Sequence, residues 1–340
     1  MVTTSSRVIA IVLAGGRGTR LRPLTDEHAK PALPFAGGHR IVDFVLSNLV
    51  NSRISPIYLL AQYKPQSLIQ HLSTRWGLSS LDGGRSLEIL LPRRRSEPHG
   101  YKGTADAVYQ NLHLIDRHQP DLVAVFAADH VYRMDVRQMI DFHELRDADV
   151  TVAAVPVPVE KASSFGIIGA DAEGRVREFH EKPERPDEMP LTPDRAYASM
   201  GNYLFRPEVL IAGLRQANAA GEHDFGQHLL PRFAQSHRTY AYDFATNRVP
   251  GVEPWEEPAY WRDVGTVEAY TAALRDVVGP KPRFRLCNAE WPIRGNSADR
   301  TAVCVLDSGA ASTLQLPGRA AAHARVTERK LERPGRSPAR

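Results

Sequence analysis

The sequence feature that most limits the possible folds of this chain is a glycine-rich loop directly after the first apolar run. Residues Val8–Leu13 read VIAIVL, a continuous apolar run that predicts a buried strand. The chain then enters AGGRGTR, residues 14–20. Glycines let several backbone N–H groups approach one anion, and Arg17 adds a planar set of donors that matches phosphate oxygens. The loop therefore predicts a phosphate-binding site, and the alternative is an ordinary glycine turn between a strand and a helix.

The loop does not match two common nucleotide-binding motifs. The dinucleotide fingerprint G-x-G-x-x-G, counted from Gly16, needs a third glycine where Leu21 stands. The P-loop motif ends in Gly-Lys followed by Ser or Thr, and the sequence contains no such run. The loop therefore predicts phosphate binding in a nucleotide enzyme that is neither a dinucleotide-binding protein of that type nor a P-loop protein.

Composition and charge narrow the class further. The chain has 340 residues and a formal net charge of +4, and residues 319–340 carry many arginines and few acids. A nucleic-acid-binding surface is therefore not indicated. No apolar run approaches the roughly 18 residues of a membrane span, and residues 1–7 lack the apolar core of a signal peptide. We expect no membrane partner and a cytoplasmic location.

Apolar runs alternate with amphipathic stretches up to residue 279. This alternation predicts an α/β fold with a largely parallel sheet covered on both faces. Two runs, 166–170 and 176–180, are separated by five turn-forming residues and predict a hairpin, so we expect a mixed sheet. The other predicted strands are 8–13, 57–61, 87–91, 122–127, 150–155, 199–205 and 239–243. The predicted helices are 41–51, 65–75, 104–117, 136–147, 207–218, 223–235 and 266–278.

Lys30 and Asp129 are the first candidates for chemistry beyond the loop. Lys30 lies in a proline-rich stretch and either adds a second cation beside the phosphates or is a solvated surface lysine. Asp129 ends an apolar strand, and ligands of open α/β sheets bind beyond the carboxyl ends of strands. A carboxylate there is well placed to hold Mg²⁺ against a phosphate. The alternative is that Asp129 caps the next helix.

Two later segments carry further charged candidates. Lys182, in Glu181-Lys182-Pro183, could pair with a substrate phosphate, although Lys-Pro is also a common loop start. Asp263, in YWRDVGT, could be the second carboxylate on the metal, an arrangement typical of phosphoryl transfer. The alternative is that Asp263 or Thr266 caps the following helix.

A glycine turn also opens the helix predicted at residue 104. In GYKGTADAV, residues 100–108, small residues at a helix N-terminus leave room for a flat ring or a ribose. Thr104 is alternatively a simple N-cap. The thirteen histidines show none of the common zinc motifs, so they predict no metal site.

Taken in order, these segments resemble the glucose-1-phosphate adenylyltransferases, also called ADP-glucose pyrophosphorylases. The similarity runs from about residue 8 to 295 and rests on LAGGRGTRL, GGHRIVDFVLSN, YKGTADAVYQN, ASMG, HDFG and YWRDVGT. It implies a Rossmann-like nucleotidyltransferase domain, an α/β fold with a mixed, mostly parallel central sheet flanked by helices. It also implies the substrates ATP and glucose 1-phosphate, a Mg²⁺ cofactor and a role in glycogen or α-glucan synthesis.

The resemblance implies roles for individual residues. The nucleotide would contact Leu13, Ala14, Gly15, Gly16, Gly18, Thr19, Gln62, Gly103, Thr104 and Ala105. The sugar phosphate would contact Tyr101, Gly166, Glu181, Lys182 and Ser199. Arg17, Lys30, Asp129 and Lys182 would act in catalysis, and Asp129 and Asp263 would hold the metal.

The family continues into a β-helix domain whose hexapeptide repeats are missing here. We therefore expect a catalytic domain over residues 1–279. Residues 280–340 are expected to be a remnant of the β-helix domain followed by a disordered basic tail. The family is homotetrameric, and the missing repeats leave assembly open. Two other functions also stay open, namely transfer from another nucleotide or to another hexose phosphate, and a non-catalytic regulatory subunit.

Overall fold

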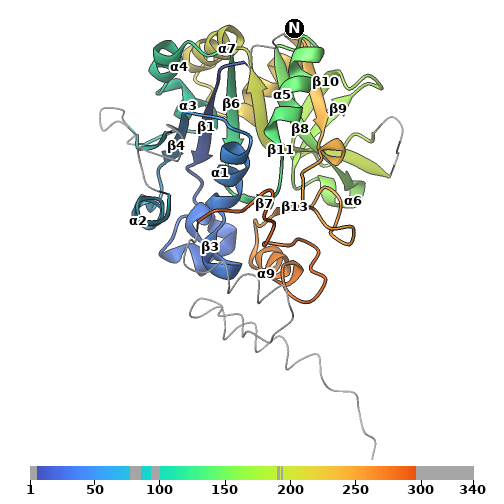
Figure 1. The fold of residues 1–340 in the computed structure, drawn as a ribbon. Coiled ribbons are helices and arrows are strands. Elements are labelled where there is room, and N and C mark those ends of the chain that lie inside the picture. The colour runs from blue at the N-terminus through green and yellow to red at the C-terminus, as the bar shows by residue number, and fades with distance from the viewer. Residues whose placement is uncertain (1–5, 77–85, 93–99, 190–191, 193, 296–340) are drawn as a thin grey trace, which may run out of the picture.

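The computed structural model describes residues 6–76, 86–92, 100–189, 192 and 194–295. Its core is a nine-stranded sheet in which four neighbouring strands run parallel in the order β6-β1-β4-β5 (Figure 1). Almost every residue of the inner strands is buried, as expected for a sheet covered on both faces. The four parallel strands are β1 (Val8–Ala14), β4 (Ile57–Ala61), β6 (Leu122–Ala127) and the edge strand β5 (Leu87–Leu90).

The second half of the sheet is mostly antiparallel, which confirms the predicted mixed sheet. The long strand β11 (Arg195–Phe205) pairs with β6 and carries β8 (Val150–Pro158) and β9 (Gly166–Ala170) beyond it. Strand β9 forms the predicted hairpin with β10 (Val176–Glu181). Strand β12 (Thr239–Asp243) runs parallel to β8 at the other branch of the sheet.

Helices cover both faces of the sheet. On one face, α1, α2 and α5 pack with the even-numbered residues of β1; on the other face, α3, α4, α7 and α8 pack with Ile9 and Ile11. The alternation of side chains along β1 therefore feeds two separate apolar clusters. The helices are α1 (Val42–Asn51), α2 (Pro65–Arg75), α3 (Thr104–Tyr109), α4 (His113–His118), α5 (Val136–Leu145), α6 (Val159–Ala162), α7 (Pro207–Ala219), α8 (Leu230–Ser236) and α9 (Val267–Asp276).

Two predicted helices are each divided in the structure. The helix predicted over residues 104–117 breaks into α3 and α4 where the Asn111 amide donates to the carbonyl oxygen of Ala107, 2.9 Å away, and so competes with the backbone. The helix predicted over 223–235 begins as a π-helical turn, Phe225–Leu229, before α8. Pro231 in the first turn of α8 has no N–H to donate backwards, which favours an irregular turn before it.

Two small sheets lie outside the main one and were not predicted. Strand β7 (His130–Tyr132) pairs antiparallel with β13 (Trp261–Asp263), and β2 (Pro34–Phe35) pairs with β3 (His39–Arg40). Strands of two or three residues are too short to show alternation in a sequence. The first of these sheets joins Asp263 to the segment that follows β6.

Residues 280–295 cross back over the molecule and pack on α1. Phe284, Leu286 and Ile293 join an apolar cluster with α9, which lies at the same end of the molecule as β3 (Figure 1). The Asn51 side chain donates to the carbonyl oxygen of Pro292 at 3.1 Å, and the Ser47 hydroxyl accepts from the backbone N–H of Arg294 at 2.8 Å. This segment is therefore an ordered part of the same body. The predicted domain boundary at residue 279 remains a prediction, since residues 296–340 lie outside the described residues.

Within the described ranges, no helix combines the length and the apolar character that crossing a bilayer requires. The predicted basic tail at residues 318–340 and most of the polar N-terminus, residues 1–5, lie outside the described residues.

Candidate active site

The glycine-rich loop leaves β1 and turns back at Gly18. Gly18 has a φ of 61°, and a Cβ there would lie 3.0 Å from Thr25 Cγ2, so both conformation and space favour glycine. The Thr25 hydroxyl donates to the carbonyl oxygen of Gly18 at 2.8 Å and fixes the turn. A Cβ on Gly16 would meet no atom within 4 Å, so the backbone at Gly16 is open to a ligand.

The turn after β4 holds this loop from the side. The Lys64 ammonium donates to the carbonyl oxygens of Thr25, at 2.8 Å, and of Asp26. The Arg17 guanidinium lies over the Tyr63 ring, 4.8 Å from its centroid, and donates to the Tyr63 hydroxyl. Tyr63 therefore contacts the arginine of the glycine-rich loop directly, and Lys64 holds the segment whose Thr25 bonds to Gly18.

Lys30 is a buried bridge between two aspartates. Its side-chain nitrogen lies 2.9 Å from an oxygen of Asp129 and 3.0 Å from an oxygen of Asp263. The residue is only 7% exposed, so Lys30 is not a solvated surface lysine. Asp129 comes from the end of β6 and Asp263 from β13, and neither caps a helix. Asp135 and Thr266 cap α5 and α9 instead.

The charges of this group stabilise one another. Burial alone would lower the pKa of Lys30, but the carboxylates of Asp129 and Asp263 outweigh it and raise that pKa. Burial alone would likewise raise the pKa of Asp129. The Lys30 ammonium, with a smaller contribution from His130, outweighs it and holds that pKa well below its usual range. Lys30 is therefore charged and Asp129 ionised at neutral pH.

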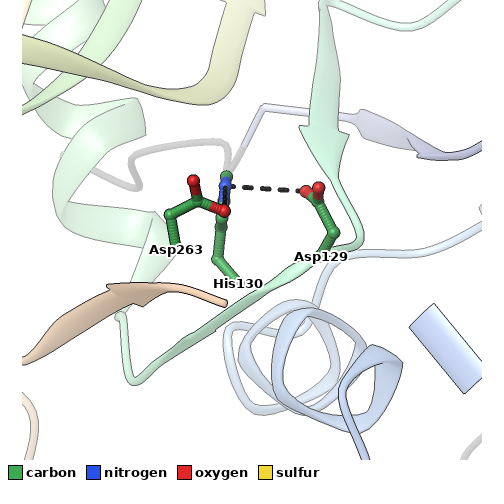
Figure 2. A group of neighbouring side chains, drawn as sticks. All are labelled: Asp129, His130 and Asp263. Carbon is green, nitrogen blue, oxygen red and sulfur yellow. Dashed lines mark ion pairs between the residues drawn. The ribbon is translucent and has the colours of Figure 1, made fainter. Parts of the chain in front are cut away.

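The structure adds His130 to the two predicted metal residues, and all three side chains point toward one another (Figure 2). One ligand atom from each of Asp129, His130 and Asp263 lies within 4.8 Å of the others. Two carboxylates are suitable ligands for a hard divalent cation, and the Lys30 ammonium already shows that a positive charge fits between them. The residues present therefore fit a divalent metal. The zinc motifs sought in the sequence could not reveal His130, whose proximity to Asp263 depends on the pairing of β7 with β13.

A second group of residues lies at the ends of β9 and β10. The side chain of Lys182 is 54% exposed and forms an ion pair with Glu181. A Cβ on Gly166 or on Gly226 would lie 3.0 Å or 2.6 Å from the same oxygen of Glu181. The two glycines therefore make room for this carboxylate on both sides.

The first residues of α3 are hydrogen-bonded to His223 and Asp224, which come before the π-helical turn and α8. The backbone N–H of Ala105 donates to the carbonyl oxygen of His223 at 2.9 Å, and the Thr104 hydroxyl donates to Asp224 at 2.9 Å. Gly103, not Thr104, occupies the N-cap position. A Cβ on Gly103 would lie 2.3 Å from the His223 carbonyl oxygen, so this contact requires glycine.

A cavity of about 550 Å³ connects these groups at the carboxyl ends of the parallel strands. This volume is within the usual range for a small-molecule site. The predicted residues that line it are Leu13, Ala14, Gly15, Gly16, Arg17, Lys30, Gln62, Tyr101, Gly103, Thr104, Asp129, Glu181 and Lys182.

Six predicted residues do not line this cavity. Three of them contact residues that line the cavity. Asp263 forms an ion pair with Lys30, and Gly166 lies against Glu181. Ser199 accepts a hydrogen bond from the backbone N–H of Gly201. The other three are Gly18, Thr19 and Ala105. The lining residues that the sequence analysis did not assign are Pro31, Leu60, Tyr63, Lys102, Ala107, Ala127, Gly201, Tyr203, Asp224, Phe225 and Gly226. Asp224, Phe225 and Gly226 belong to the HDFG segment, so their signal was present in the sequence.

Comparisons with known proteins agree with this geometry. Residues 9–278 match the family described as "Nucleotidyl transferase". The chain is 51% identical over 302 residues to a glucose-1-phosphate adenylyltransferase of Thermodesulfovibrio yellowstonii, and the match covers 88% of this chain and 74% of that protein. The proteins of the same name from Thermus thermophilus and Mycobacterium leprae are 49% and 50% identical. They match over 84% and 86% of this chain and 70% and 72% of their own lengths.

The matched region contains the glycine-rich loop, Lys30, Asp129, Asp263 and the Glu181–Lys182 pair. A family match over most of the chain, with relatives at half identity, is far above chance similarity. The chain therefore belongs to the nucleotidyl transferase family and, within it, to the glucose-1-phosphate adenylyltransferases.

Proposed function

We propose that this protein transfers the AMP group of ATP to α-D-glucose 1-phosphate, giving ADP-glucose and pyrophosphate. The observation that carries the proposal is the single cavity that joins the phosphate loop, the Lys30–Asp129 pair and the Glu181–Lys182 pair. Two anionic substrates need two separate groups of binding residues facing one space, and the two groups of charged residues that line this cavity support such an arrangement.

The loop and its supports would hold the triphosphate of ATP. Backbone N–H groups at Gly15 and Gly16 and the guanidinium of Arg17 are suited to phosphate oxygens. Gln62 and the start of α3 would contact the base and the ribose. Thr25 fixes the turn of the loop at Gly18, and Lys64 in turn holds the carbonyl oxygen of Thr25. This fixed arrangement lowers the entropic cost of bringing the reacting groups together.

The sugar phosphate would bind on the other side of the cavity, with Lys182 on its phosphate and Glu181 on its hydroxyl groups. Tyr101, Gly166 and Ser199 would complete this side. A phosphate oxygen of the sugar phosphate attacks the α-phosphorus of ATP, and the bond from that phosphorus to the pyrophosphate oxygen breaks. The attacking phosphate is already ionised, so no general base is required.

Catalysis would rest on charge placed in advance around the transferring phosphoryl group. Members of this family use a divalent metal, and we propose Mg²⁺ held by Asp129 and Asp263. The metal would neutralise phosphate charge when bound. Lys30, freed from one or both carboxylates by that cation, would donate to phosphate oxygens. The role in glycogen or α-glucan synthesis and the cytoplasmic location expected from the sequence remain part of this proposal.

The first test measures pyrophosphate release from ATP, glucose 1-phosphate and MgCl₂, beside a panel of other nucleotides and hexose phosphates. Replacing Asp129 by Asn should lower kcat roughly 10²–10³-fold, by analogy with the loss of one oxyanion-stabilising group. The matched control is Asp121→Asn, which removes a carboxylate whose partner is the exposed Arg7 and which lies outside the cavity.

The other functions left open by the sequence appear as distinct outcomes. Faster turnover with another nucleotide or hexose phosphate would identify a different transferase. No release with any pair by a protein that is folded by circular dichroism would indicate a non-catalytic subunit. Unchanged kcat in Asp129→Asn would contradict the role given to that residue.

A further inference from the structure

His130 faces the same point as the two carboxylates because of strand register. In the antiparallel pair β7–β13, His130 is directly opposite Asp263, so both side chains project on the same side. His130 Nε2 lies 3.5 Å from an oxygen of Asp129 and 3.9 Å from an oxygen of Asp263. Both separations are short enough for His130 Nε2 to share a small cation with either carboxylate, because two donors about 2.1 Å from one cation lie no more than about 4.2 Å apart.

The imidazole is held in this orientation by its surroundings. Its ring centroid lies 5.0 Å from that of Trp261, and its side chain is 12% exposed. Nδ1 is buried and has no hydrogen-bond partner among the described residues. The charged groups near Nε2 are the two carboxylates, and the Lys30 ammonium is bonded to the same Asp263 oxygen.

We infer that His130 is a third protein ligand of the divalent cation and supplies a nitrogen donor beside the oxygens of Asp129 and Asp263. This inference rests on the proposed function, which places the metal between the two aspartates. It adds a preference: Mg²⁺ favours oxygen ligands, whereas imidazole nitrogen is typically a ligand of transition metals, the series to which Mn²⁺ belongs. His130 would make the site tighter for Mn²⁺ than two carboxylates alone could.

The test is pulsed electron paramagnetic resonance of Mn²⁺ bound to the full chain, without nucleotide. A directly bound imidazole gives a ¹⁴N coupling in the echo modulation. We expect that coupling in the wild type and its loss in His130→Ala and in His130→Gln. The second variant keeps a polar side chain of similar length in case the first does not fold. Mn²⁺ affinity should fall about tenfold, the lower end of the effects seen around metal sites, while Mg²⁺ affinity changes less.

A second cluster provides the matched control. Glu178, His180 and Asp187 form an exposed group that could also hold a metal. The variant His180→Ala should therefore keep the ¹⁴N coupling. Loss of the coupling in His180→Ala and its persistence in His130→Ala would overturn the inference.

Failure of this inference differs from failure of the proposed function. Mn²⁺ that binds, is released by Asp129→Asn and shows no ¹⁴N coupling would mean that His130 is not a ligand, while the metal site stands. Mn²⁺ binding unaffected by Asp129→Asn would remove the proposed metal site itself, and the inference with it.

Discussion

At the scale of single residues, burial separates side chains that a sequence presents as equivalent. Lys30 and Lys64 are both lysines next to prolines, and neither context reveals what its ammonium contacts. In the structure Lys30 bridges two carboxylates, whereas Lys64 donates to the carbonyl oxygens of Thr25 and Asp26, which follow the glycine-rich loop. Residue type and strand ends identified Lys30 and Asp129 as candidates, but only packing shows that they touch.

His143 is a residue whose burial has a consequence for stability. It is 2% exposed, and its Nδ1 lies 2.7 Å from the hydroxyl oxygen of Thr151. Burial, reinforced by the positive charge of Arg206, lowers its pKa to about 4. The unfolded chain, with an ordinary histidine pKa near 6.5, binds the proton more readily. Stability should therefore fall as pH drops from about 6.5 to about 4, by roughly 3 kcal/mol at most.

Urea unfolding at a series of pH values measures this effect. The variant His143→Gln, which cannot take up the proton, should lose less stability over the same window. Below about pH 4, where His143 is protonated in both states, the two curves should run parallel. Equal losses for both proteins between pH 6.5 and 4 would show that another group is responsible.

At the scale of elements, helix α1 is tied to its neighbours by one fully buried carboxylate. Asp43 accepts hydrogen bonds from the backbone N–H of Arg40, from Trp76 Nε1 and from His71 Nε2, each at 2.7 Å. His71 lies within α2, and Trp76 follows its last residue. This carboxylate therefore joins the start of α1 to the C-terminal half of α2, and both helices cover the same face of the sheet.

Replacing Asp43 by Ala leaves several buried donors without an acceptor. We expect a loss of about 3 kcal/mol or more in the free energy of unfolding, measured by urea denaturation. The matched control is Asp26→Ala, which removes an exposed carboxylate paired with Arg22 and should change stability by no more than about 0.5 kcal/mol. If the two substitutions cost the same, the buried network does not stabilise the helix pair.

Elements also differ in how well their sequences predict them. The parallel strands were predicted closely because apolar runs mark them, and α2 was predicted closely because Pro65 marks its first turn. The breaks inside 104–117 and 223–235 were not, because they depend on a side-chain amide and a π-helical turn. Strands β7 and β13 were missed because three residues carry no period.

At the scale of the whole molecule, the candidate site is assembled from distant parts of the chain. Lys30 lies 99 positions from Asp129 and 233 positions from Asp263. Each residue could be chosen from its local sequence, but their meeting depends on the sheet order and on the short β7–β13 pair. Long-range pairings of this kind leave no local signal, which is why His130 was not found before the structure.

The packing of Trp261 on His130 has a practical consequence. The indole is 7% exposed and packs against His130 and Phe165, with ring centroids 5.0 Å and 5.5 Å away. Its fluorescence should therefore respond when a cation changes the charge beside the imidazole. Titration with MgCl₂ should shift the emission of the wild type, and Trp261→Phe should remove most of that shift, although Trp76, Trp255 and Trp291 still emit. If Trp261→Phe keeps the full emission shift, the signal comes from another tryptophan. If the shift is lost, Trp261 is an intrinsic fluorescent probe of cation binding at this site.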